Sequence, residues 1–157
     1  MNIIKRVCSL ALSFALIFCL IPQAHAANDP ETFYFVEDLG NGITVESTLE
    51  VYPSTARNTS TWGALSSNFK NNGVWVATVT LKAYFTYNGM TAGVTGTEYA
   101  KDVASGWTYT NHKITTTTVS SSSGGTATLT ATLKDFPISL PISLSIHCAP
   151  DCTITKA

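Results

Sequence analysis

The sequence predicts an all-β protein, and more specifically an immunoglobulin-like antiparallel β-sandwich of seven or eight strands. Apolar and polar residues alternate with a period of two along most of the chain, as they do in half-buried strands. The dipeptide Asn-Gly, which tolerates the positive φ angles of tight hairpin turns, occurs at residues 41–42, 72–73 and 88–89. Charged residues make up only 12% of the chain, about half the usual share. Ser and Thr replace them, which is typical of extracellular β-proteins.

The first predicted strands lie in the N-terminal third of the chain. Residues 32–36 form a short strand, and residues 43–51 alternate more loosely, with Ser47 in the middle of the apolar positions. The stretch 62–70, WGALSSNFK, is the one place where a short helix is expected.

The longest predicted strand is 74–87, VWVATVTLKAYFTY. Its alternation places Trp75, Leu81 and their apolar neighbours on one face, and we expect both residues in the core. Lys82 and Thr86 lie on the opposite face and are expected at the surface.

Two further strands are predicted near the C-terminus. Residues 126–133 alternate Ala or Leu with Thr, and residues 138–148 alternate from Ile138 to Cys148 on one face. His147 therefore points away from Cys148. Pro141 cannot donate a hydrogen bond to a neighbouring strand, so the 138–148 strand lies at a sheet edge or is kinked there.

The first 26 residues have the pattern of a secretory signal peptide. Lys5 and Arg6 precede an apolar run from Val7 to Ile21, and Ala24-His25-Ala26 supplies the cleavage pattern. The run is short for a transmembrane helix, although an uncleaved anchor is the alternative. We therefore predict a signal peptide over 1–26 and a single secreted domain over 27–157, with no stable membrane insertion after cleavage.

The net charge of the predicted mature domain limits the classes of partner that it is expected to bind. Loss of Lys5 and Arg6 leaves seven basic residues against ten acidic ones, a net charge near −3. This balance disfavours binding to nucleic acid or to anionic lipid through a basic surface.

Four segments carry a resemblance to a known family: VTLKAYFTYNG, SGWTYTNHKITTTT, GGTATLTATLK and ISLSIHC. In order and spacing they resemble the C-terminal two-thirds of small secreted β-sandwich proteins of Gram-positive gut bacteria. The resemblance covers roughly residues 73–148 and implies a secreted β-sandwich, in a family without an assigned activity. Some members carry a second Cys just after the Asn-Gly turn, where this chain reads Met90-Thr-Ala-Gly93. The resemblance implies that Cys152 replaces that missing partner.

The densest group of reactive side chains is His147-Cys148-Ala-Pro-Asp-Cys152. Zinc needs four convergent ligands, whereas His147 and Cys148 point to opposite faces. Redox pairs usually have two intervening residues near a helix N-terminus, and here there are three without a helix. Ala149-Pro150-Asp151 is typical of a turn that brings the two Cys close enough for a bridge. We predict a disulfide between Cys148 and Cys152, with two free thiols as the alternative.

Catalytic patterns are weak in this sequence. No Gly-x-Ser-x-Gly elbow occurs, and His112 stands alone as a candidate base, more typical of a solvated surface residue. Glu46 and Glu50 lie on one strand face, about 13 Å apart at ~3.3 Å per residue, which is too far for a glycosidase pair. We predict no catalytic residues, no metal and no cofactor.

Binding is the remaining class of function. Trp62, in a polar segment, and Tyr84, on the surface face of its strand, are the aromatic residues expected to be partly exposed. They are the candidate ligand-binding residues. We expect a secreted, non-catalytic β-sandwich that acts in surface or extracellular interaction, with an unknown protein or glycan as its partner. A glycan-binding module is the first alternative, and a small hydrolase using His112 is the second.

Overall fold

The computed structural model of the chain describes residues 29–52, 59–117 and 121–157. The signal peptide predicted for residues 1–26 lies outside these ranges. The described residues form nine strands: β1 (Glu31–Gly40), β2 (Ile43–Tyr52), β3 (Ser60–Asn71), β4 (Val74–Tyr87), β5 (Ala92–Val103), β6 (Thr108–Thr116), β7 (Gly125–Asp135), β8 (Ile138–Cys148) and β9 (Ile154–Lys156). Within these ranges no helix is long and apolar enough to cross a membrane.

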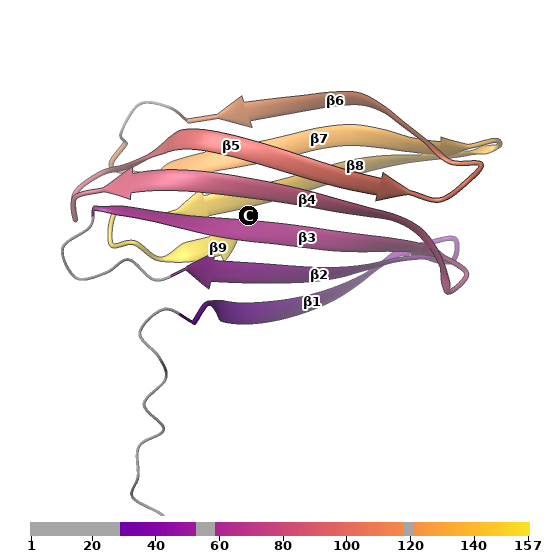
Figure 1. Cartoon of the computed structure of the whole chain (residues 1–157), viewed down its shortest axis with the longest axis horizontal. Helices are drawn as coiled ribbons and strands as arrows, with labels where there is room; N and C mark the ends of the chain where they lie inside the picture. The colour runs from indigo at the N-terminus through magenta and orange to yellow at the C-terminus, as the bar shows by residue number, and fades with distance from the viewer. Residues whose placement is uncertain (1–28, 53–58, 118–120) are drawn as a thin grey trace, which may run out of the picture.

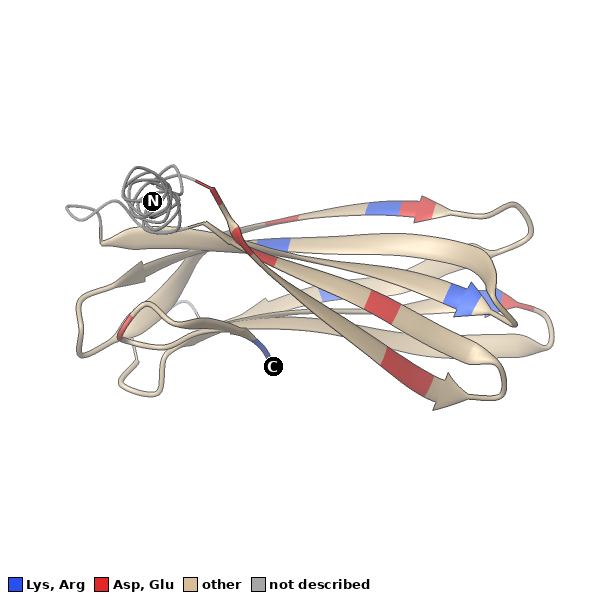
Figure 2. Cartoon of the chain, turned by 90° about the horizontal axis from the view of Figure 1, so that it is seen from below, with Lys and Arg blue, Asp and Glu red and all other residues tan. Residues whose placement is uncertain are grey.

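The strands form two antiparallel sheets that pack face to face (Figure 1). Sheet A has the order β1-β2-β3-β4-β5, and sheet B has the order β6-β7-β8-β9. The predicted all-β antiparallel sandwich is confirmed, with nine strands instead of seven or eight. Each sheet is a meander of consecutive strands, whereas the connections of an immunoglobulin domain are Greek keys. Charged residues are sparse on both sheets (Figure 2).

The prediction of a short helix over 62–70 is wrong, because these residues belong to strand β3. Strand β3 pairs with β2 on one side and with β4 on the other. Its inward positions include Gly63 and Ser67, which weaken the apolar alternation. The Ser67 hydroxyl is buried and hydrogen-bonded to that of Ser47 at 2.8 Å. Two small polar residues thus satisfy each other inside the sandwich.

The expectation that Trp75 is a core residue is also wrong. The β3–β4 register shifts between Phe69 and Lys70, so that Lys70 pairs with Trp75 and Phe69 pairs with Ala77. The extra residue, Val76, is a β-bulge that reverses the facing of the residues before it. Trp75 is 38% exposed, and its indole Nε1 donates to the Thr78 hydroxyl at 3.0 Å. From Ala77 onward the predicted facing holds, and Leu81 is fully buried.

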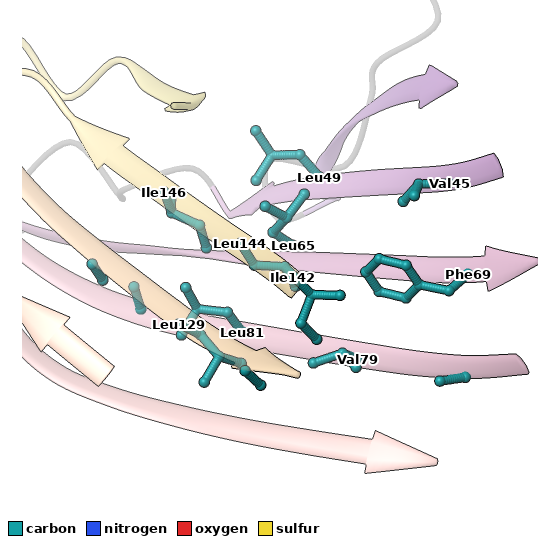
Figure 3. Close-up of a cluster of buried hydrophobic side chains, with 14 of the residues drawn as sticks. Val45, Leu49, Leu65, Phe69, Val79, Leu81, Leu129, Ile142, Leu144 and Ile146 are labelled. Atoms are coloured by element: carbon teal, nitrogen blue, oxygen red, sulfur yellow. The ribbon is translucent and has the colours of Figure 1, made fainter. Parts of the chain in front are cut away.

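The core lies between the two sheets (Figure 3). Leu65 of β3 and Leu81 of β4 face Leu129 of β7 and Leu144 of β8, and all four are fully or almost fully buried. The two sheets come close together at Gly125, where an added Cβ would lie 2.8 Å from the Gly93 Cα. Only glycine fits at this contact.

The edge position predicted for Pro141 is confirmed. Strand β8 pairs with β7 along its length, but β9 pairs only with Ile146–Cys148. Within the described ranges, Pro141 therefore has a neighbouring strand on one side only, and its missing N–H costs no ladder hydrogen bond.

Candidate functional site on the outer face of sheet A

Trp62 and Tyr84 lie side by side on the outer face of sheet A. They are directly opposite each other in the β3–β4 register, and Tyr52 is opposite Trp62 in the β2–β3 register. All three side chains point away from the core: Trp62 and Tyr84 each lie between two buried neighbours, and Tyr52 follows Val51, which packs against the core. Each is partly exposed, as was expected for Trp62 and Tyr84.

The rings of this row stack on one another. The ring centroids of Tyr52 and Trp62 are 3.5 Å apart with an interplanar angle of 14°. Those of Trp62 and Tyr84 are 6.2 Å apart and tilted by 40°. The tilted Trp62–Tyr84 contact has one of the geometries that aromatic pairs favour, whereas Tyr52 lies almost face to face on the indole.

Lys82 completes the group. It precedes Tyr84 by two residues on the same face of β4, and its Nζ lies 4.1 Å from the Trp62 ring centroid and 4.9 Å from that of Tyr84. Since Tyr52 covers one face of the indole, Lys82 lies over the other. We call Tyr52, Trp62, Tyr84 and Lys82 the aromatic cluster.

Two carboxylates border the aromatic cluster. The Tyr52 hydroxyl donates to Glu50 at 3.2 Å, and the Tyr84 hydroxyl donates to Glu98 at 3.1 Å. Partial burial, followed by the negative charge of Glu50, raises the pKa of Tyr52. The hydrogen bond to Tyr84 is the largest of the effects that raise the pKa of Lys82. Both shifts stabilise the neutral phenol and the charged ammonium at neutral pH.

The outer face continues as rows of polar side chains. The hydroxyls of Ser66 and Thr80 are 3.0 Å apart, and Thr78 donates to the Asn68 side chain at 2.6 Å. The middle of the face is therefore polar, between the aromatic cluster at one end of the strands and Trp75 with the Lys70–Glu46 ion pair at the other.

Sequence reasoning missed Tyr52, Glu50 and Glu98 as members of this group. Tyr52 follows the alternating stretch 43–51 by one residue, and only the β2–β3 register shows that it lies beside Trp62. Lys82 was expected at the surface, but its place over Trp62 depends on the β3–β4 register.

Cys148 and Cys152 are unbridged in the structure, and the disulfide stays a prediction. Cys148 is fully buried in β8, and its Sγ donates to the carbonyl of Ala149 at 3.4 Å. Burial raises its pKa to about 12. His147 points to the other face, as predicted, and its Nδ1 is 2.9 Å from the Thr126 hydroxyl.

His112 lies away from the aromatic cluster, on β6. Its Nε2 is 3.0 Å from the Tyr99 hydroxyl, and its ring contacts those of Tyr99 and Tyr109. The described partners of His112 are therefore phenols, with no carboxylate among them. Over residues 29–52, 59–117 and 121–157, no three His, Cys, Asp or Glu side chains are grouped to hold a metal ion.

A groove of about 600 Å³ opens between the two sheets on the side of β1 and β8. Phe35, Val45 and Phe69 of sheet A line it, together with Ile142 of sheet B. The Lys156 ammonium forms an ion pair with Glu37 and lies 5.2 Å from the Phe35 ring centroid, so it ties β9 to β1 across this groove.

Comparison with known proteins gives no relative: no family model matches the chain, and no match was found among curated proteins or solved structures.

Proposed function

We propose that the chain is a secreted, non-catalytic β-sandwich that binds an extracellular partner through the outer face of sheet A. Secretion is proposed from the signal pattern of residues 1–26. The resemblance to small secreted proteins of Gram-positive gut bacteria belongs to the same proposal.

The observation that carries the binding proposal is the aromatic cluster. Tyr and Trp are the residues that most often dominate binding energy at protein interfaces, usually at the centre of a patch with a polar rim. Here Trp62 is held between Tyr52 and Lys82, and Glu50 and Glu98 border the group. A rigid aromatic centre of this kind loses little conformational freedom on binding.

Glycan binding is the second candidate, and the polar rows beside the aromatic cluster favour it. Hydroxyl and amide groups of Ser66, Thr80 and Asn68 can exchange hydrogen bonds with sugar hydroxyls. Stacking on Trp62 is less favourable, because Tyr52 and Lys82 already cover the two faces of its ring. The geometry therefore supports a protein partner better than a sugar.

The test is a capture experiment with the purified chain immobilised beside its Trp62→Ala variant. Trp75→Ala is the matched control. Trp75 is also a partly exposed tryptophan of sheet A, but it lies on β4 opposite Lys70, at the other end of the strands. A partner from the native culture that is retained by the chain and by Trp75→Ala, but lost with Trp62→Ala, supports the proposal. A glycan array probed with the same three proteins decides the alternative. Equal retention by all three proteins would place binding elsewhere.

A further inference from the structure

Strand β1 is an outer strand of sheet A that exposes an unusual amount of apolar surface. Its side chains Phe33, Tyr34, Val36 and Leu39 are 44%, 77%, 76% and 48% exposed. They come from both faces of the strand, because successive residues point to opposite faces. A strand with two apolar faces is ordinarily covered by neighbours.

The other outer strands carry features that prevent pairing with a further strand. Strand β8 has Pro141, and β6 has a register shift before Lys113. Strand β5 has a register shift near its start and Lys101 further along. Proline, lysine and bulges are among the devices by which natural proteins block sheet edges.

Strand β1 has none of these devices from Glu31 to Asp38. Its register with β2 is continuous over this range, and it contains no Pro or Lys. Of its acidic residues, Glu37 is paired with Lys156, and Asp38 accepts a hydrogen bond from the Gly40 N–H in the adjoining turn. The described part of the chain thus blocks three long edges and leaves the fourth open.

The hydrogen-bonding pattern of sheet A shows which residues of β1 turn their backbone N–H and C=O groups toward this open edge. The Asn72 N–H donates to the Gly42 carbonyl at 2.7 Å, so Gly42 points toward β3. Residues of an antiparallel strand turn alternately to their two neighbours, and Val45 therefore turns to β1, where it pairs with Glu37. The alternate residues of β1 then turn their N–H and C=O groups outward: Thr32, Tyr34, Val36 and Asp38.

We propose that β1 pairs with β1 of a second copy of this chain, antiparallel, with Phe35 opposite its counterpart, to form one continuous ten-stranded sheet. In this register Tyr34 lies opposite Val36, and Thr32 lies opposite Asp38, in both halves of the symmetric contact. All four outward-turning residues of each copy then exchange ladder hydrogen bonds.

Charge and backbone conformation favour this register over the two adjacent symmetric registers, which are centred on Tyr34 and on Val36. With Phe35 at the centre, Glu31 lies opposite Leu39 and Glu37 lies opposite Phe33, so no acid faces an acid. Centring the contact on Tyr34 would place Glu31 opposite Glu37, and like charges directly opposite are destabilising. Centring it on Val36 would place Thr32 opposite Gly40, whose φ of 79° is not that of a strand. The edge is thus complementary to itself, as a two-fold interface requires.

Sedimentation equilibrium of the purified chain tests the proposal, with Val36→Lys and Tyr34→Lys as variants. We expect a dimer for the unchanged chain. Either lysine removes a cross-strand apolar pair from both halves of the contact, and should raise the dimer Kd about tenfold or more. Val74→Lys is the matched control, because Val74 is 68% exposed but lies on β4, and it should leave the Kd unchanged. A monomer at every concentration, or dimers equally stable with lysine on β1, would overturn the proposal.

Cross-linking tests the register separately. A mixture of Tyr34→Cys and Val36→Cys chains should yield a disulfide between residues 34 and 36 of different copies, identified by peptide mass. Paired strand positions lie about 5.5 Å apart at Cα, within the range for a disulfide. Each variant alone should give little cross-link through these positions. Cross-links of 34 to 34 or of 36 to 36 that equal the mixed product would exclude this register.

Discussion

The Nζ of Lys82 lies 4.1 Å from the ring centroid of Trp62, on the face opposite to the one that Tyr52 covers. The indole is therefore held between a phenol and an ammonium, although all three side chains lie on the outer face of a sheet. Such an arrangement fixes the orientation of Trp62 before any partner is bound.

The first prediction concerns the coupling between Tyr52 and Trp62. A double-mutant cycle with Tyr52→Ala and Trp62→Ala should give a coupling energy of about 0.5–1.5 kcal/mol, as expected for a stacked aromatic pair. Urea unfolding of the four proteins measures it. The same cycle with Tyr52 and Trp75, which lie at opposite ends of the strands, should give additive effects.

The second prediction compares two residues of β4 that the sequence pattern placed on one face. Leu81→Ala should lower the free energy of unfolding by about 2–5 kcal/mol, because Leu81 is fully buried. Trp75→Ala should cost less than about 1.5 kcal/mol, because the side chain is partly exposed and its main polar contact is with Thr78. Thermal melts of the two variants distinguish these outcomes, and an equal cost would contradict the bulge at Val76.

Much of the fold could be predicted from the sequence, because alternation records which face of a strand is buried. The prediction failed where the apolar–polar alternation is broken. In β3, the inward Ser67 is satisfied by Ser47 of β2, a pairing between residues distant in sequence. In β4, one extra residue at Val76 reverses the facing of Trp75, and alternation alone does not show an insertion.

The candidate site could also be predicted only in part. Trp62 and Tyr84 could be found from their polar sequence neighbours. Their contact, and the membership of Tyr52, depend on registers between strands, which short segments of sequence do not encode. The open edge of β1 likewise becomes visible only when the strand order is known.

The third prediction concerns the close contact between Gly125 of β7 and Gly93 of β5. A Cβ added at Gly125 would lie 2.8 Å from the Gly93 Cα, and backbone cannot move aside as a flexible side chain can. Gly125→Ala should therefore destabilise the chain by about 1–3 kcal/mol through overpacking. Gly73→Ala is a useful comparison, because no atom lies within 4 Å of its added Cβ, although its positive φ adds some strain. Chemical denaturation of both variants should show that Gly125→Ala alone carries a steric cost.

The fourth prediction is the disulfide between Cys148 and Cys152. Chain prepared under oxidising conditions and digested without reductant should yield one peptide containing both residues, lighter than its reduced form by two hydrogens. The bridge would close a very short loop, so reduction should change the melting temperature little. Recovery of both residues as alkylated free thiols from oxidised chain would contradict the prediction.

The fifth prediction concerns the reduced chain and follows from the buried thiol of Cys148. Burial raises its pKa from an ordinary 9.0 to about 12, because the thiolate loses its hydration. At pH 8 the folded, reduced chain should therefore react with iodoacetamide at Cys152 well before Cys148, as peptide mapping would show.

A thiol whose pKa is higher in the folded state binds its proton more tightly there. Its contribution to stability is thus complete below pH 9 and is lost as the pH rises toward 12. The unfolding midpoint of the reduced chain should fall over this interval more steeply than that of a Cys148→Ala variant. Parallel curves for the two proteins would show that Cys148 is accessible to water in the folded state.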